Sequence, residues 1–300
     1  MRKIIISAVF LFVASALADN GGKAGFSYLK IGVDARAAAM GDAYTSLAND
    51  ATASYWNPAG LAAAKSHSII LTHNAWLQGI NHEYAAVHLF QGRHNIAFAL
   101  NMIHISGIYL RGERATDTPD GETSAKNLYL GISYASTFFE DWKIGLQVKY
   151  LYEKYYLYAA EGFAFDFGIL KTNLIYNISW GAVIQNIGKM NILRTDETQL
   201  PLIFRTGLSY MLPWNLLENS PQIAADLVYV NEDVTYINLG LNAGILKNFE
   251  VRLGYVLGRD SFNFTSGFGI VYHAYNFSYA FVPYQYDLGN THRFSVIINF

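Results

Sequence analysis

Strict alternation of side-chain type dominates the chain from residue 66 onward. One face of the stretch WKIGLQVKYLY carries only apolar or aromatic side chains, namely Trp142, Ile144, Leu146, Val148, Tyr150 and Tyr152. Lysine, glycine and glutamine occupy the positions between them up to Lys149. Side chains of a strand point alternately to opposite faces of the sheet, so this stretch has one apolar face and one polar face. The same pattern recurs to the end of the chain and predicts an all-β fold.

About fourteen segments show this alternation. They lie near residues 66–75, 81–90, 93–106, 127–138, 142–156, 160–170, 174–186, 202–211, 221–231, 235–246, 248–258, 264–273, 275–284 and 291–300. Segments of this length are long enough to cross a bilayer as tilted strands. Some connections are short (91–92, 140–141, 171–173 and 247–248), whereas 111–126 is long and charged. Short turns at one end and longer loops at the other are typical of outer-membrane barrels.

The composition of the two faces separates a membrane barrel from a soluble β-sandwich. Only 15% of the residues are charged and 15% are aromatic, whereas a soluble domain is about 25% charged. A sandwich would carry lysine, glutamate and threonine on its solvent face. Here the second face is rich in glycine, asparagine and serine, and aromatic residues collect near strand ends, as in the girdles of membrane barrels. Residues 66–300 are therefore predicted to form a transmembrane antiparallel β-barrel of about fourteen strands.

The N-terminus predicts export. Arg2 and Lys3 precede an apolar run, and Ala16-Leu17-Ala18 matches the cleavage site of a secretory signal peptide, so residues 1–18 are interpreted as that peptide. After it, no run approaches the roughly 18 continuous apolar residues of a membrane helix. Because hydrocarbon accommodates only helices and closed barrels, we expect the chain in the bacterial outer membrane, surrounded by its lipid.

Residues 19–65 lack the alternation. The alanine-rich stretch 34–50 shows near-helical spacing, and Asp34 is placed to cap its N-terminus. Residues 50–56 predict a second short helix. Pro58 should end that helix at Asn57, and Gly60 permits a sharp turn.

A longer stretch, AAAMGDAYTSLANDATASYWNPAGLA, resembles the N-terminal segment of the FadL-like outer-membrane barrels, and within them the PorV/PorQ branch. Three motifs carry the resemblance: Gly41-Asp42-Ala43, Asn49-Asp50-Ala51 and Asn57-Pro58-Ala59-Gly60-Leu61. The end of the chain, DLGNTHRFSVIINF, is also similar, and its final Phe300 resembles the signal read by the barrel-assembly machinery. The resemblance implies that residues 19–65 fold inward as a helical hatch, with the Asn-Pro step where the hatch joins the wall.

The resemblance also implies two functions of different classes. The PorV-like branch implies a component or cargo-receiving partner of the type IX protein secretion system, with secretion-system proteins and secreted cargo as partners. The wider FadL-like group implies a transporter for hydrophobic small molecules. The hydrophilic loop 111–126 favours the first function, because a transporter of apolar ligands should carry an apolar extracellular binding region.

Catalysis, cofactor binding and metal binding have little support. His82 and His88 share a face but have no carboxylate at ligand spacing, and Asp117, Asp120 and Glu122 match no calcium-loop signature. There is no cysteine, no phosphate-binding loop and no motif that joins a serine to a histidine. The net charge of -2 and the lack of a basic stretch argue against nucleic acid. We expect a non-enzyme without cofactors.

Charged residues on the polar faces of the strands permit two interpretations. They are Lys143, Lys149, Asp166, Arg205, Asp226, Arg252 and Arg293. They either brace the hatch against the wall or line a polar conduit. Bracing is favoured, because a plugged barrel needs partners for its interior charges.

Overall fold

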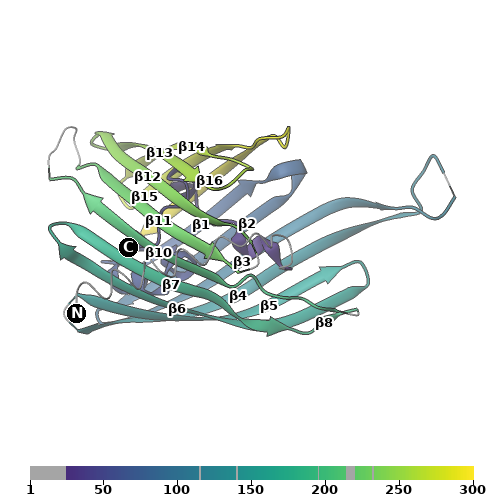
Figure 1. Cartoon of the computed structure of the whole chain (residues 1–300), viewed down its shortest axis with the longest axis horizontal. Coiled ribbons are helices and arrows are strands. Elements are labelled where there is room, and N and C mark those ends of the chain that lie inside the picture. The colour runs from purple at the N-terminus through teal and green to yellow at the C-terminus, as the bar shows by residue number, and fades with distance from the viewer. Residues whose placement is uncertain (1–24, 115, 140, 195, 214–219, 232) are drawn as a thin grey trace.

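The computed structural model describes residues 25–300 except 115, 140, 195, 214–219 and 232, so the predicted signal peptide lies outside the described residues. Within that part of the chain, one closed antiparallel barrel runs in the order β1-β16-β15-β14-β13-β12-β11-β10-β7-β6-β5-β4-β3-β2 (Figure 1). The wall strands are β1 Ser68–Ala75, β2 Asn81–Gln91, β3 His94–Leu110, β4 Gly121–Phe139, β5 Trp142–Tyr155, β6 Tyr158–Ile175, β7 Ile178–Met190, β10 Ile203–Met211, β11 Gln222–Val230, β12 Thr235–Leu246, β13 Phe249–Leu257, β14 Phe264–Tyr272, β15 Tyr275–Pro283 and β16 Asn290–Asn299. A short pair, β8 Ile192–Leu193 and β9 Asp196–Glu197, follows β7. The predicted fourteen-stranded barrel is confirmed.

Two predicted boundaries were wrong. Residues 121–126, predicted as loop, form the start of β4, where Gly121 pairs with Leu110 of β3. More and less exposed residues continue to alternate there, although the side chains are mostly polar. These two strands therefore extend as a hairpin past the rest of the barrel (Figure 1). Similarly, β6 continues through the predicted turn 171–173, with Asn173 at a φ of 51°, and the chain reverses at Tyr176-Asn177.

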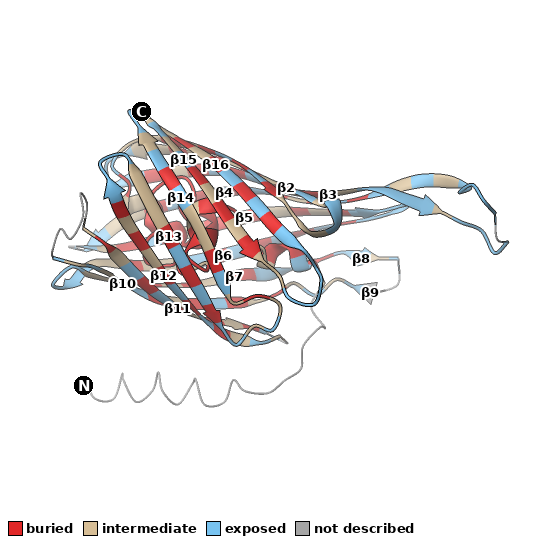
Figure 2. Cartoon of the chain, turned by 90° about the horizontal axis from the view of Figure 1, so that it is seen from above, coloured by how far each residue is buried: buried red, intermediate tan, exposed pale blue. Residues whose placement is uncertain are grey.

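The outer surface of the barrel is apolar. Along each wall strand, exposed and buried residues alternate, which gives the striped pattern in Figure 2. The exposed set consists of large side chains such as Phe98, Leu130, Phe165 and Leu239. Soluble monomers rarely expose a continuous apolar belt, whereas a membrane barrel must. The chain is therefore an outer-membrane β-barrel. Separately, none of the helices in the described part of the chain is long and apolar enough to span a membrane.

The lengths of the connections assign the two ends of the barrel. Residues 92–93, 176–177, 247–248 and 273–274 are tight turns at the end where the chain finishes. The opposite end carries the longer connections 76–80, 111–120, 191–202, 258–263 and 284–289, together with the short connections 156–157 and 231–234. Periplasmic turns are short and extracellular loops longer in such barrels, so the second end faces outward. Residues 212–221, between β10 and β11, are one longer connection at the periplasmic end.

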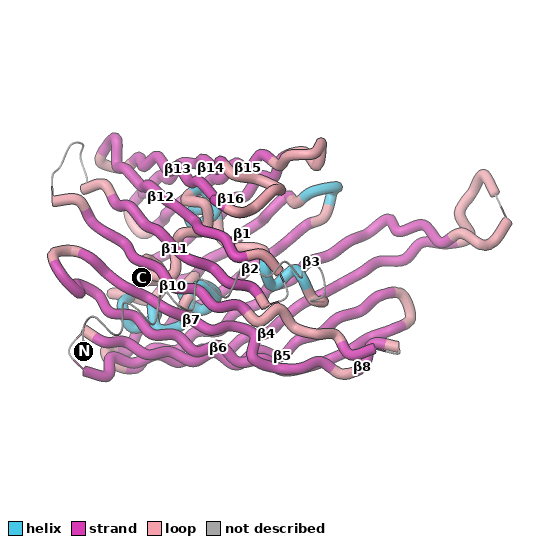
Figure 3. The backbone as a smooth tube through the Cα atoms, viewed as in Figure 1, coloured by secondary structure: helices cyan, strands magenta, loops and turns pink. Residues whose placement is uncertain are grey.

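The described residues before β1, from Phe26 to Ala64, lie inside the barrel (Figure 3). They contain η1 Ser27–Lys30, α2 Ala35–Ala39, α3 Ala53–Trp56 and η2 Pro58–Ala63, and a further turn, η3 Leu77–Gly79, follows β1. Asp34 caps α2 by accepting a hydrogen bond of 2.9 Å from the Ala37 N–H. The helix is much shorter than predicted, because Gly41 and Asp42 both adopt a φ of 64° and end it. As predicted, α3 stops at Asn57 before Pro58.

Candidate functional site

Inward-facing glycines of the wall allow the N-terminal segment to pack directly on the strands. A β carbon at any of six wall glycines would collide with this segment: Gly145 with Pro58, Gly168 with Asn57, Gly181 with Thr45, Gly240 with Met40, Gly254 with Gly41 and Gly267 with Ala39. Glycine in a strand weakens it and marks a place where another backbone approaches closely. The glycine-rich inner face seen in the sequence is thus the contact surface for residues 39–58.

Asn57 is a central contact between this segment and the wall. Its side chain is fully buried and donates hydrogen bonds of 3.1 Å to the carbonyl oxygens of Thr45 and Ile169. Its Oδ1 accepts from the Ala59 N–H at 3.2 Å, which begins η2 at Pro58. The Asn-Pro step therefore touches β6, but the chain enters the wall only at Ser68, so the expected junction at this step is wrong.

The other motif residues shape the segment. The Gly41 N–H donates to Thr265 Oγ1 at 3.0 Å, and the Asp42 carbonyl accepts from Asn238 Nδ2 at 3.2 Å. Asp50 Oδ1 accepts from both the N–H and the hydroxyl of Thr52, at 2.9 and 2.6 Å.

Small motif residues fill tight spaces. Ala43, Ala59 and Gly60 are buried, and Gly60 lies against the Ala48 carbonyl. Asn49 is exposed. These contacts are structural and offer no reactive group.

Phe300 lies apart from the motif. It exchanges backbone hydrogen bonds of 3.1 Å with His67, just before β1, and its ring stacks on the His67 ring with 5.3 Å between centroids. The last residue of the chain thus pairs beside the first wall strand, and its side chain is exposed.

The charged residues of the inner face are buried and brace the segment or the wall. Asp226 accepts from the N–H groups of Tyr44 and Thr45 at 2.9 and 2.8 Å. The Arg205 guanidinium lies 5.2 Å from the Trp56 ring centre, and Arg293 donates to the Asp34 carbonyl at 3.3 Å.

Ion pairs inside the wall supplement these contacts. Lys149 pairs with Asp166 at 2.6 Å, and Arg252 with Glu250 at 2.6 Å. Lys143 instead donates to Thr172 Oγ1 at 2.9 Å. The bracing prediction is confirmed, although most contacts to the segment use its backbone groups or a ring rather than a charged partner.

The candidate metal ligands are not grouped. In the part of the chain that the structure describes, no three histidine, aspartate or glutamate side chains come close enough to hold an ion. His82 and His88 bond instead to the side chains of Asn101 and Asn95, at 2.6 and 3.0 Å. Asp120 accepts from the Gly112 N–H at 2.5 Å, across the loop that precedes β4.

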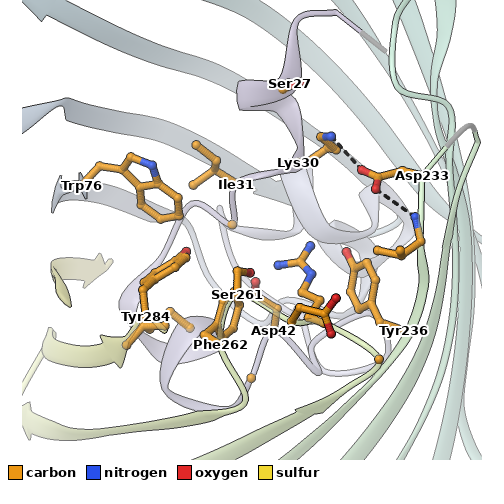
Figure 4. Close-up of a pocket in the computed structure, with 18 of the residues that line it drawn as sticks. Ser27, Lys30, Ile31, Asp42, Trp76, Asp233, Tyr236, Ser261, Phe262 and Tyr284 are labelled. Carbon is orange, nitrogen blue, oxygen red and sulfur yellow. Dashed lines mark hydrogen bonds and ion pairs between the residues drawn. The ribbon is translucent and has the colours of Figure 1, made fainter. Parts of the chain in front are cut away.

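A pocket of about 330 Å³ lies at the extracellular mouth, between the N-terminal segment and the loops (Figure 4). Four aromatic side chains line it: Trp76, Tyr236, Phe262 and Tyr284. The Tyr284 ring packs edge-on against Trp76, with 5.5 Å between centroids, and lies 5.0 Å from Phe262. Ala38 and Gly41 belong to its lining from the segment's side.

Charged groups surround this aromatic lining. Lys30 pairs with Asp233 at 2.8 Å and so ties η1 to the loop after β11 (Figure 4). Partial burial alone would raise the pKa of Asp233, but the hydrogen bonds from Lys30 and the Val234 N–H outweigh it and lower this pKa. The Arg259 guanidinium lies 4.0 Å from the Tyr236 ring centre. The pocket therefore combines flat aromatic surfaces with charged side chains in its lining, namely Lys30, Asp42, Asp233, Arg259, Asp260 and Arg293.

The sequence did not reveal this pocket, because a site for apolar ligands was expected in one long apolar loop. Trp76, Phe262 and Tyr284 come from three different connections. Their common signal is an aromatic residue just beyond a strand end, at a position that the lipid-facing pattern does not require.

No protein-family model and no curated protein matches the chain. Among solved structures, the fold is similar to a deletion mutant of TodX, a monoaromatic hydrocarbon channel, with a TM-score of 0.63, 12% identity, and coverage of 90% of this chain and 99% of that one. It is also similar to a FadL homologue of Pseudomonas aeruginosa, with a TM-score of 0.61, 9% identity, and coverage of 89% and 98%. At these identities the likeness concerns the fold, which is a closed fourteen-stranded barrel similar to the barrels of these two proteins.

Proposed function

We propose that the protein is a FadL-like transporter that admits small hydrophobic molecules through the outer membrane. The observation that carries the proposal is the aromatic pocket at the extracellular mouth. An engineered apolar cavity of about 150 Å³ holds benzene, so a pocket of about 330 Å³ can hold a ligand of one or two aromatic rings. Small-molecule sites are concave and mostly apolar, with a few polar groups that fix orientation.

In this proposal residues 1–18 are removed, residues 19–65 act as a hatch, and residues 66–300 form the wall. The hatch fills the lumen beneath the pocket, so a bound molecule can pass inward only if part of the hatch moves. The part nearest the pocket is tied to the wall by the Lys30–Asp233 pair and by hydrogen bonds with the side chains of Ser295, Thr265, Asn238 and Arg293.

The opposite part of the hatch is also held by several hydrogen bonds. Asp226 receives two backbone N–H groups there, and Asn57 is buried among three hydrogen bonds. Net contributions of single neutral hydrogen bonds are about 0.5–1.5 kcal/mol, and those of bonds to a charged group are about 1.5–3 kcal/mol. We propose that residues 30–42 move to admit a bound molecule, because this part of the segment lines the pocket.

The direct test is binding of naphthalene to the purified barrel in detergent, followed by the fluorescence of the ligand. Phe262→Ala removes a ring that is 6% exposed in the pocket, whereas Phe264→Ala removes a ring that is 48% exposed on the outer surface. Because an aromatic pair contributes about 0.5–1.5 kcal/mol beyond burial, Phe262→Ala should weaken binding about 2- to 10-fold. Phe264→Ala should leave it unchanged. Equal affinity in all three proteins would contradict the pocket as the binding site.

The second candidate function is the role in type IX secretion that the PorV/PorQ resemblance implies, with secretion-system proteins and secreted cargo as partners. One observation favours it: the hairpin of β3 and β4 projects beyond the rest of the barrel and ends in the polar loop 111–120 (Figure 1). Tyr109 on this hairpin is 62% exposed, so an aromatic ring is available to a protein partner.

A further inference from the structure

On three neighbouring strands, the outward-facing apolar run ends at a basic side chain. On β3, Phe98, Leu100 and Met102 are followed outward by His104. On β4, Ile132, Leu130 and Leu128 are followed by Lys126, and on β5, Val148, Tyr150 and Tyr152 are followed by Lys154. The three basic residues are also direct register partners, because His104 pairs with Lys126 and Lys126 pairs with Lys154. They form one basic row.

The basic row lies at the outer boundary of the hydrocarbon layer. At about 3.3 Å per residue and a tilt of about 40°, β5 rises about 30 Å from Trp142 to Lys154. The apolar band of a membrane barrel is about 25 Å tall and ends in aromatic girdles. Trp142 fits the periplasmic girdle and Tyr152 the extracellular one, so Lys154 stands at the level of the lipid head groups.

The basic row is not neutralised by the described residues of the protein. Lys126 and Lys154 are exposed, and neither makes an ion pair with a described residue. Of the outward carboxylates nearby, Glu83 is paired with His73 at 2.7 Å, and Glu161 is the register partner of Tyr152 rather than of Lys154. Like charges directly opposite each other on a sheet are destabilising, unless an anion lies between them.

We propose that this basic row binds the phosphate group of a glycolipid in the outer leaflet. The two ammonium groups and the imidazole surround a site for one phosphate, while Leu128, Leu130 and Tyr150 below them offer an apolar surface to the acyl chains. A basic residue at a membrane surface contributes about 1 kcal/mol of attraction to anionic lipid. The site belongs to the outer wall and is independent of the pocket in the lumen.

The test is native mass spectrometry of the purified barrel in detergent with added lipid A, the phosphate-bearing glycolipid of this leaflet. Lys126→Gln and Lys154→Gln should each weaken binding roughly 5-fold, and the double variant roughly 25-fold. Lys247→Gln removes the same charge from an exposed periplasmic turn and should have no effect. The folded state of each variant is checked by its shifted migration in unboiled gels.

Two further measurements identify the ligand. Lipid A stripped of its phosphates should bind as weakly to the native protein as lipid A does to the double variant. Inorganic phosphate at the same concentration should not compete, because it lacks acyl chains. Unchanged lipid A binding in the double variant, equal binding of the dephosphorylated lipid, or competition by free phosphate would overturn the proposal.

Discussion

Replacing Gly168 with leucine is expected to release the N-terminal segment, the proposed hatch, from the lumen. A β carbon at this position would collide with Asn57 Oδ1 and lie 3.0 Å from Pro58 Cδ. The wall cannot retreat, because β6 is held on both sides by β5 and β7. Overpacking costs about 1–3 kcal/mol, and the displaced Asn57 would also lose three hydrogen bonds of about 0.5–1.5 kcal/mol each. The segment should leave while the barrel stays folded.

Labelling measures this release, because the native chain has no cysteine. Cysteines introduced at Ala38 and Ala43, both buried, should resist a large maleimide in the native background and react in the Gly168→Leu background. Gly121→Leu is the matched control, since a β carbon there meets only a side-chain atom at 3.6 Å. Protection that persists in Gly168→Leu would show that the hatch does not depend on this contact.

Replacing Leu239 with arginine should destabilise the barrel by about 2–4 kcal/mol, the cost of a basic side chain on the lipid face near the bilayer midplane. Leu239 lies in the middle of β12 and is 39% exposed on the outer surface. Leu246→Arg is the matched control on the same strand, because Leu246 lies at the periplasmic end and is 62% exposed. Its cost should be about 0–1 kcal/mol.

Unfolding in urea in the presence of lipid vesicles measures both costs. Equal losses for Leu239→Arg and Leu246→Arg would mean that the middle of β12 does not lie near the bilayer midplane. The inward neighbour Asn238 is no control, although alternation alone would suggest it. Asn238 is buried against the Asp42 carbonyl, so an arginine there would have to displace the hatch.

The strands could be predicted from the sequence because every outward side chain in contact with lipid must be apolar. Alternation therefore persists along each strand, as in β12, where Ile237, Leu239 and Leu241 all face outward. The predicted strand boundaries were wrong where strands continue beyond the hydrocarbon layer, because outward side chains there need not be apolar. Residues 121–126 and 171–173 are polar strand ends outside the hydrocarbon layer, and polar residues there are equally compatible with loop.

The interior was only partly predictable. Small and charged residues on the inner faces indicated a packed lumen, but which glycine meets which hatch residue depends on the register of strands far apart in the sequence. Gly181 and Gly254, for example, contact residues Thr45 and Gly41 that precede them by more than a hundred positions. The pocket was beyond prediction for the same reason, because Trp76, Phe262 and Tyr284 come together only when the barrel closes.

The most direct test of the proposed transport function compares two rates in a strain that lacks this protein. One is uptake of a small aromatic hydrocarbon, and the other is secretion of proteins that carry the type IX sorting domain. Transport through the aromatic pocket predicts that uptake falls, that secretion stays normal, and that the native gene but not the Phe262→Ala variant restores full uptake. Normal uptake combined with a loss of secretion would contradict the transporter and assign the protein to secretion.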